Sequence, residues 1–167
     1  MSTASHRKEA PTSVSVSVIT VSDTRTMETD TSGRAIAELL EQAGHRVHGR
    51  EILKDEPAHV EASVRRAVAD AGVDVVITTG GTGITSRDST YEAIDGLLEK
   101  RLDGFGELFR MLSYSEIGAA AMLTRATAGL AGGTIVIALP GSEHAARLGM
   151  EKLVLPELGH LVREARR

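Results

Sequence analysis

The sequence predicts a three-layer α/β/α sandwich built on a mainly parallel sheet. β-branched segments alternate with segments of helical periodicity, and glycines punctuate the joints between them. Such alternation favours right-handed crossovers and a sheet that helices cover on both faces. The length, 167 residues, is that of one ordinary domain. We therefore expect a single domain over residues 14–167, preceded by a flexible tail over residues 1–13.

The first half of the chain predicts three strands, each followed by a helix. The strands are expected at 14–21, 47–53 and 74–79, and β-branched residues are densest in the first and third of them. Apolar residues with helical spacing then end at Ala43, before Gly44, and run from Pro57 to Ala71, before Gly72. The third helix is expected to open at a capping box, Ser89-Thr-Tyr-Glu92.

The second half predicts more helix and one further strand. A short helical piece carries Phe105 to Leu112, and a second capping box, Ser113-Tyr-Ser-Glu116, predicts a new helix through residues 116–127. A strong strand follows at 134–139 and is broken by Pro140-Gly141. One or two helices are expected to complete the chain.

Composition excludes several classes of function. A formal charge of −4 argues against a broad nucleic-acid footprint, which usually needs a basic face. The absence of cysteine excludes disulfides and thiolate chemistry and fits a reducing compartment, for which the cytoplasm is the default. No apolar run is long enough to span a bilayer, and residues 1–13 lack the apolar core of a signal peptide. We expect neither a membrane nor a nucleic-acid partner.

Polar residues follow every predicted parallel strand. Ligands of open α/β sheets bind beyond the carboxyl ends of the strands, near a topological switch point. At these positions the sequence has Ser22-Asp23, Lys54-Asp55, the loop Gly80-Gly81-Thr82-Gly83, and Pro140-Gly141-Ser142. If the strands are parallel, these groups converge on one rim although they are far apart in the sequence.

The glycine loop has two interpretations. Glycines between a strand and a helix let the backbone approach a ligand and point N–H groups at an anion, but they also serve in purely structural turns. The loop matches neither the dinucleotide fingerprint nor the P-loop. The hydroxyls that accompany it favour binding, since they can bond phosphate or polar ring edges; they belong to Thr78, Thr79, Thr82, Thr85 and Ser86.

Asp55 and Asp88 are the candidate acidic pair. Two carboxylates at one rim suit Mg²⁺, which prefers oxygen ligands and commonly bridges nucleotide phosphates. Each aspartate alone could equally serve the positive end of a following helix, as Ser142 could serve as an N-cap. The six histidines show no metal-ligand spacing, and no nucleophile elbow indicates a hydrolase.

Four separated segments together carry a family resemblance. They are VSDTRTMETDTSG (21–33), TTGGTGITSRD (78–88), GFGELFRMLSYSEIGAAAMLTRATAGL (104–130) and ALPGS (138–142). With these segments the sequence resembles the MogA/MoaB family of molybdenum cofactor biosynthesis, and the first and third are most similar to the MoaB branch. The resemblance implies a molybdopterin-binding α/β fold covering nearly everything from Val14 onward.

In catalytically active members, the resemblance implies transfer of AMP from ATP to the terminal phosphate of molybdopterin with release of pyrophosphate. It puts the essential carboxylates, with Mg²⁺, at Asp55 and Asp88, and a hydroxyl at Thr124, where serine is frequent in the family. The pterin or phosphate groups would lie against Gly80, Gly81, Thr82 and Gly83, with Thr79, Ser22, Asp23, Pro140, Gly141 and Ser142 in the same pocket.

The resemblance leaves alternatives open. Some MoaB-branch members are of uncertain catalytic status, so a non-catalytic molybdopterin-binding or assembly protein is the second hypothesis, and a general nucleotide-binding module is the third. The family also implies a homo-oligomer, a trimer or a hexamer, with residues 104–125 near an interface. The aromatic residues Tyr91, Phe105, Phe109 and Tyr114 fall close to that segment, either packed internally or offered to another subunit.

Overall fold

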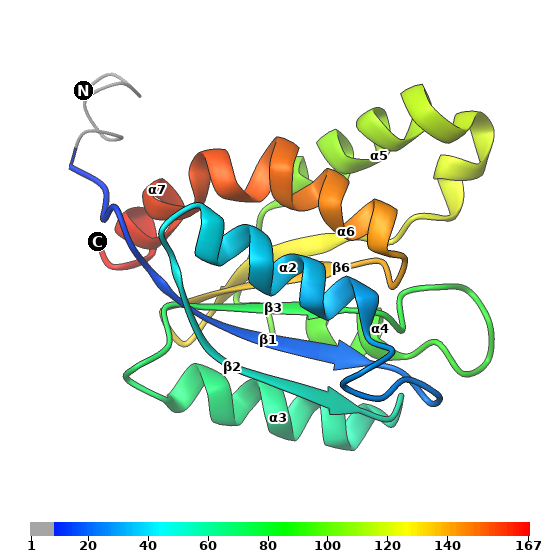
Figure 1. Ribbon diagram of the computed structural model, residues 1–167, viewed down its shortest axis with the longest axis horizontal. Coiled ribbons are helices and arrows are strands. Elements are labelled where there is room, and N and C mark those ends of the chain that lie inside the picture. Colours follow the sequence, from blue (N-terminus) through cyan, green and yellow to red (C-terminus); the bar gives the residue numbers. More distant parts are fainter. Residues whose placement is uncertain (1–8) are drawn as a thin grey trace.

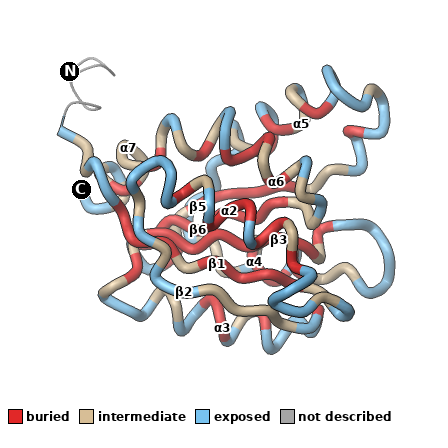
Figure 2. Tube along the Cα trace, in the orientation of Figure 1, coloured by how far each residue is buried: buried red, intermediate tan, exposed pale blue. Residues whose placement is uncertain are grey.

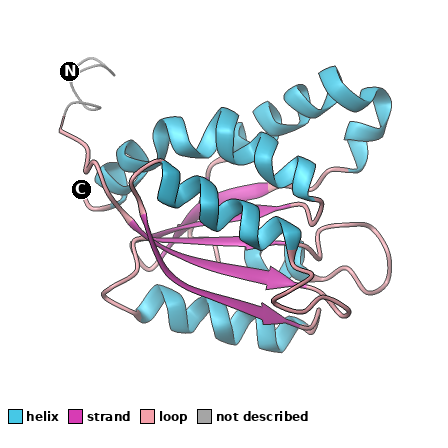
Figure 3. Cartoon of the chain, viewed as in Figure 1, coloured by secondary structure: helices cyan, strands magenta, loops and turns pink. Residues whose placement is uncertain are grey.

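A computed structural model describes residues 9–167 and shows one six-stranded sheet between two layers of helices (Figures 1 and 3). The elements, in chain order, are β1 (Ser15–Val21), α2 (Thr31–Gln42), β2 (Arg46–Leu53), α3 (Pro57–Ala69), β3 (Val75–Thr79), α4 (Thr90–Asp95), β4 (Lys100–Arg101), α5 (Asp103–Ile117), the 3₁₀ helix η1 (Gly118–Leu123), β5 (Thr127–Ala131), β6 (Thr134–Leu139), α6 (Glu143–Gly149), the π-helical segment η2 (Met150–Val154) and α7 (Leu155–Ala165).

The strand order is β2-β1-β3-β6-β5-β4. β2, β1, β3 and β6 are mutually parallel, whereas β5 and β4 are antiparallel to their neighbours. The predicted mainly parallel sheet is confirmed. The chain moves outward from β1 to β2 and then returns to β3 on the other side of β1, so the topological switch point lies between β1 and β3.

The helices cover both faces of the sheet, as the sequence predicts. α2, α5, α6 and α7 lie over one face, and α3 and α4 lie over the other (Figure 1). The central strands are buried from both sides, and the burial colours of Figure 2 show them as the core of the molecule. The core is almost wholly aliphatic; Phe109 is its one fully buried aromatic side chain among the described residues. Within residues 9–167, no helix is both long and apolar enough to cross a membrane.

The segment before β1 runs against α7. Glu9 forms an ion pair with Arg163, and the carbonyl oxygen of Pro11 lies 2.3 Å from where a Cβ on Gly159 would stand. The other part of the predicted flexible tail, residues 1–8, lies outside the described residues. The tail therefore stays a prediction for residues 1–8.

The predicted break at Ser113 is wrong. α5 is continuous through this residue, which is only 5% exposed, and the helix ends at Gly118, where φ is +65°. No residue between Asp103 and Ile117 stops the helix, so no helix begins at Ser113 and the capping pattern there has no helix N-terminus to cap. The predicted helix over 116–127 is mostly η1, followed by extended chain that enters β5.

The hairpin of β5 and β6 is also absent from the predictions. Gly132 and Gly133 form its two-residue turn with φ of +54° and +80°, and Ala131 pairs with Thr134. A Gly-Gly turn between strands is a hairpin signal. The β5 sequence, TAGLA, has little intrinsic strand preference, because alanine and glycine are depleted in strands. Pairing with β6 decides its conformation.

Candidate active site at the carboxyl ends of the parallel strands

The loops that follow the four parallel strands meet at one rim of the sheet. The backbone N–H of Ser22, after β1, donates to the carbonyl of Leu53 at the end of β2 (2.8 Å). The N–H of Gly80, after β3, donates to the carbonyl of Leu139 at the end of β6 (3.1 Å). The convergence inferred from parallel topology is confirmed.

The glycine loop begins with two residues in the left-handed region. Gly80 has φ of +100° and Gly81 has φ of +68°. A Cβ on Gly80 would stand 2.2 Å from the carbonyl oxygen of Val21, the last residue of β1. Only glycine fits where the chain leaves β3 this close to β1. The loop is therefore built on the switch point itself.

The loop after β6 supports the glycine loop from the other side. The Thr79 hydroxyl donates to the Pro140 carbonyl (2.9 Å), and a Cβ on Gly141 would lie 3.1 Å from the Cα of Gly80. Ser142 accepts from the N–H of Ala145 (3.2 Å) and caps α6, as one interpretation of the sequence holds. Thr79 and Ser142 thus already have partners within the protein.

Asp55 joins three of the rim loops. Its Oδ1 accepts from the hydroxyl (2.6 Å) and the N–H (3.3 Å) of Ser89, and its own N–H donates to Oδ1 of Asp23 (3.1 Å). The side chain is only 6% exposed. A Cβ on Gly81 would lie 2.6 Å from Asp55 Oδ2. That carboxylate oxygen therefore faces the bare backbone of the glycine loop.

The capping box predicted at Ser89 does not form. Ser89 does precede α4, but its side chain makes no capping bond, because the hydroxyl donates to Asp55 instead. Glu92, the other half of the predicted box, pairs with Arg125. Both side chains are used for tertiary contacts at the rim.

Asp88 contacts its own loop. Its Oδ2 accepts from both the N–H (2.9 Å) and the hydroxyl (2.6 Å) of Thr85, and a Cβ on Gly83 would lie 2.6 Å from the same oxygen. These bonds, the hydroxyl bond foremost, lower the pKa of the Asp88 carboxyl from its ordinary value. Asp88 is consequently ionised at neutral pH.

Asp55 and Asp88 are the residues of this rim that could hold a Mg²⁺ ion together with a ligand. Asp88 directly precedes Ser89, the residue bound to Asp55, so both carboxylates belong to one rim. In the part of the chain from residue 9 onward, no group of three or more His, Cys, Asp or Glu side chains could enclose a metal. Mg²⁺ usually retains waters and takes one or two carboxylates together with substrate phosphates. Asp55 and Asp88 could therefore hold Mg²⁺ only together with the phosphate of a ligand.

Arg125 secures the outer part of the glycine loop. Its Nε donates to the carbonyl of Thr82 (3.0 Å), and its Nη atoms contact the carbonyl of Gly83 and the carboxylate of Glu92. Thr124 immediately precedes this arginine and is half-buried. In the structure, Arg125 bonds to two carbonyls of the glycine loop and so helps to fix the shape of that loop.

Asp23 and Arg87 connect the first and third rim loops. Arg87 Nη2 lies 3.0 Å from Oδ2 of Asp23 and 3.2 Å from Oε1 of Glu56. The N–H of Asp55 and then Arg87 lower the pKa of the Asp23 carboxyl. Asp23 therefore carries its negative charge at neutral pH, and that charge is already paired.

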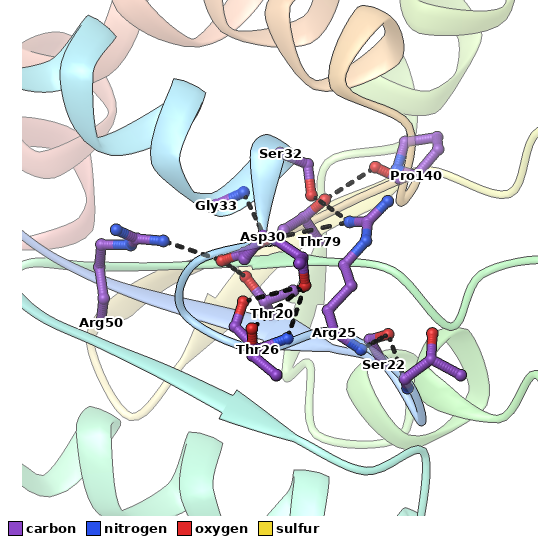
Figure 4. A network of polar contacts seen from close by, with 12 residues as sticks. Thr20, Ser22, Arg25, Thr26, Asp30, Ser32, Gly33, Arg50, Thr79 and Pro140 are labelled. Atoms are coloured by element: carbon purple, nitrogen blue, oxygen red, sulfur yellow. Dashed lines mark hydrogen bonds and ion pairs between the residues drawn. The ribbon is translucent and has the colours of Figure 1, made fainter.

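Asp30 is a buried member of the rim that sequence reasoning missed. Figure 4 shows it surrounded by donors: the Thr20 hydroxyl at 2.8 Å, the Gly33 N–H at 3.0 Å and Arg50 Nη2 at 2.9 Å, with Arg25 Nη1 at 3.9 Å. It is 1% exposed and caps α2. An aspartate before a helix is a readable N-cap signal. Its burial with two arginines is decided by the tertiary structure.

An open, mainly parallel sheet with a glycine loop at its switch point is typical of α/β proteins that bind ligands beyond the carboxyl ends of the strands. Residues 17–160 match the family described as "Probable molybdopterin binding domain". The chain belongs to this family, as the four separated segments of its sequence predict.

Relatives agree with this assignment. The molybdenum cofactor biosynthesis protein B of Bacillus cereus is 52% identical over 168 aligned positions, covering 100% of this chain and 99% of that protein. A crystal structure of a molybdenum cofactor biosynthesis protein B superposes with a TM-score of 0.92 at 52% identity, covering 95% of this chain and 99% of that one. The crystal structure of the tungsten cofactor synthesizing protein MoaB from Pyrococcus furiosus superposes with a TM-score of 0.85 at 41% identity. The match covers 95% of this chain and 100% of that one.

Proposed function

We propose that this protein acts in molybdenum cofactor biosynthesis as an Mg²⁺- and ATP-dependent molybdopterin adenylyltransferase. Membership in the molybdopterin-binding family and the names of its full-length relatives support the pathway. The observation that carries the enzymatic proposal is the position of Asp55, a nearly buried carboxylate whose Oδ2 faces the side-chain-free backbone of Gly81. An acidic group at the surface of an anion-binding loop suits metal-assisted phosphate chemistry.

The proposed reaction balances without any further reagent. An oxygen of the molybdopterin phosphate attacks the α-phosphorus of ATP, forming a new P–O bond and breaking the bond to the β-phosphate bridge. Pyrophosphate leaves with the electron pair, and adenylyl-molybdopterin remains. The attacking phosphate is already ionised at neutral pH, so no general base is required. The barrier lies in bringing two anions together in line.

The residues of this chain address that barrier by position and charge. The N–H of Gly80 is used by the Leu139 carbonyl, so the backbone of the loop beyond it would offer the N–H donors at the switch point, and Arg125 holds this loop from outside. Asp55 and Asp88 would hold Mg²⁺, which supplies charge neutralisation for the polyphosphate. Thr124 would contribute a hydroxyl at the edge of the same loop.

A second candidate function is molybdopterin binding without catalysis. The orientation of Asp88 favours it, because Oδ2 of this carboxylate is engaged by Thr85 and braces its own loop. In this case Asp88 is structural, and the rim binds the pterin for an assembly step.

One experiment separates these candidates. The purified protein is incubated with molybdopterin, ATP and Mg²⁺, and pyrophosphate and adenylylated pterin are measured. Formation of both products in equal amounts supports the enzyme. Saturable binding of molybdopterin without either product would reject it in favour of the binding protein, and ATP binding without any pterin preference would indicate a general nucleotide-binding module.

The proposed assembly is a homo-oligomer, a trimer or a hexamer. α5 and η1 support it, since large apolar side chains on this arm are exposed: Leu108, Met111, Tyr114, Ile117, Met122 and Leu123. Clustered exposed apolar side chains of this size mark interaction surfaces. Light scattering at micromolar concentration should give the mass of three or six chains, and Met122→Glu should reduce it; a wild-type monomer would contradict the proposal.

A further inference from the structure

A cavity of about 520 Å³ opens beside the candidate active site, between the loop after β1 and the edge strand β2. We call it the β1–β2 cavity. Its lining includes Ser22 and Asp23 of the rim, and Asp23 accepts from the N–H of Asp55, so the cavity adjoins Asp55. Small-molecule sites have volumes of roughly 300 to 1,000 Å³. The cavity is thus large enough for a substantial part of a ligand.

Two arginines of the lining share one buried carboxylate. Arg25 and Arg50 approach Asp30 from opposite sides, as Figure 4 shows. Asp30 is 1% exposed, and Ser32 further fixes Arg25 by accepting from its Nη1 at 2.7 Å. Two guanidinium groups against one carboxylate leave one positive charge uncompensated, and both are held in fixed orientations.

The remaining acidic residues of the lining do not neutralise that charge. Glu51 is paired with Arg66 at 3.0 Å, and Asp23 shares Arg87 with Glu56; neither arginine belongs to the lining. Lys54 adds another cation; it is exposed and has no ion pair within residues 9–167. The lining of the β1–β2 cavity thus has three cations, Arg25, Arg50 and Lys54, against two carboxylates, each of which also contacts an arginine outside the lining.

We propose that the β1–β2 cavity is a phosphoanion subsite of the candidate active site, recognised by Arg25, Arg50 and Lys54. This inference rests on the proposed function, in which both substrates carry phosphate. Arginine and lysine in combination are suited to phosphate oxygens, arginine through its planar fork and lysine as a mobile point charge. The polyphosphate of ATP and the phosphate of molybdopterin share this chemistry, and the test separates them.

Lys54→Gln tests the subsite, because this exposed side chain can be changed without breaking the Asp30 network. The matched control is Lys100→Gln, which removes the same charge from β4 at the opposite edge of the sheet. Calorimetry on the full chain with Mg²⁺ measures the affinities for pyrophosphate, ATP, molybdopterin and adenosine. We expect Lys54→Gln to weaken phosphate-bearing ligands about fivefold, with adenosine and the Lys100→Gln control unchanged.

The ligand that is weakened identifies the source of the phosphate. Loss confined to pyrophosphate and ATP supports the subsite as a polyphosphate site, and loss confined to molybdopterin supports it as a pterin-phosphate site. Unchanged affinity for all three phosphate ligands, or an equal change in Lys100→Gln, would overturn the proposal. Wild-type adenylyl transfer together with unchanged Lys54→Gln affinity rejects the subsite alone. Lys54-dependent pyrophosphate binding without any adenylyl transfer rejects the proposed enzyme alone.

Discussion

Asp55 and Asp88 stand on the same rim but are held in opposite ways. Asp55 is nearly buried and bonds to residues more than thirty positions away, Asp23 before it and Ser89 after it. Asp88 is bonded to Thr85, three positions earlier, in a loop that is mostly exposed. Asp55 therefore connects several loops of the rim, whereas Asp88 stabilises only its own loop.

The difference teaches how much each position depends on the rest of the fold. The geometry at Asp55 exists only when β1, β2 and β3 are assembled, so it reports on the intact site. The geometry at Asp88 is local and can form or open with the loop alone. Exposed loops are drawn from the low-stability end of a structure, which suits groups that must adjust to a ligand.

The largest expected effect is that of Asp55→Asn. The amide keeps an oxygen for Ser89, so the fold should survive, but the charge that faces Gly81 is lost. We expect adenylyl transfer to fall by about a hundredfold to a thousandfold, with the melting temperature lowered by only a few degrees. Steady-state kinetics and calorimetry measure both quantities. Unchanged turnover would remove Asp55 from the proposed metal site.

The second-largest expected effect is that of Asp88→Asn. Turnover should fall by about a hundredfold if this carboxylate also holds Mg²⁺. Its effect on stability should be below about 1 kcal/mol, since the bonds to Thr85 are local and half-exposed. Asp70→Asn is the matched control, because Asp70 likewise accepts a nearby backbone N–H, from Gly72, but lies before β3 at the other end of the sheet. Full turnover in Asp88→Asn would leave this aspartate a loop brace and favour the non-catalytic candidate.

The unfolding free energies of Gly81→Ala and Gly83→Ala show how rigidly Asp55 and Asp88 are held. A Cβ on either glycine would stand 2.6 Å from a carboxylate oxygen, of Asp55 and of Asp88 respectively. At Gly81 the φ is also positive and a second atom, Thr90 Oγ1, would be 2.1 Å away. We expect Gly81→Ala to cost about 2–3 kcal/mol of unfolding free energy and Gly83→Ala less than about 1 kcal/mol, since the Asp88 side chain can move. Urea unfolding measures both; equal costs would show that the two aspartates are equally rigid.

The smallest expected effect is the pH dependence of the Asp88 brace. Its folded-state pKa is depressed, chiefly by the Thr85 hydroxyl. The contact should thus be complete above the ordinary aspartate pKa of about 4 and be lost only as the pH falls through the lower folded value. Carbon-detected NMR of the carboxyl group should give a midpoint below the ordinary aspartate pKa, and Thr85→Val should raise that midpoint. A midpoint at the ordinary value would indicate that the brace does not form in solution.

Much of the parallel half of the fold could be predicted from local pattern. β1, β3 and β6 are dense in β-branched residues, and the groups after the parallel strands had to converge on one rim. The antiparallel half was missed for a physical reason. TAGLA and the two-residue β4 have no strand preference of their own and become strands only by pairing at the edge of the sheet.

The capping boxes show the same limit within single residues. Ser89 and Ser113 both satisfy the local pattern, yet one hydroxyl donates to Asp55 and the other serine lies buried inside α5. A sequence signal describes which bonds a side chain can make with its own helix. It does not show whether the side chain will instead bond to a residue that is distant in the sequence and close in the fold.

The sequence by itself determined the fold class, the alignment of the polar loops on one rim and the family, because these depend on periodicity, strand direction and ordered motifs. The tertiary structure alone decided that Asp55 faces Gly81, that Asp30 is buried between Arg25 and Arg50, and that Arg125 clamps the glycine loop. Each of these contacts joins segments from different elements, and burial changes the energy of a charge only once those elements have come together.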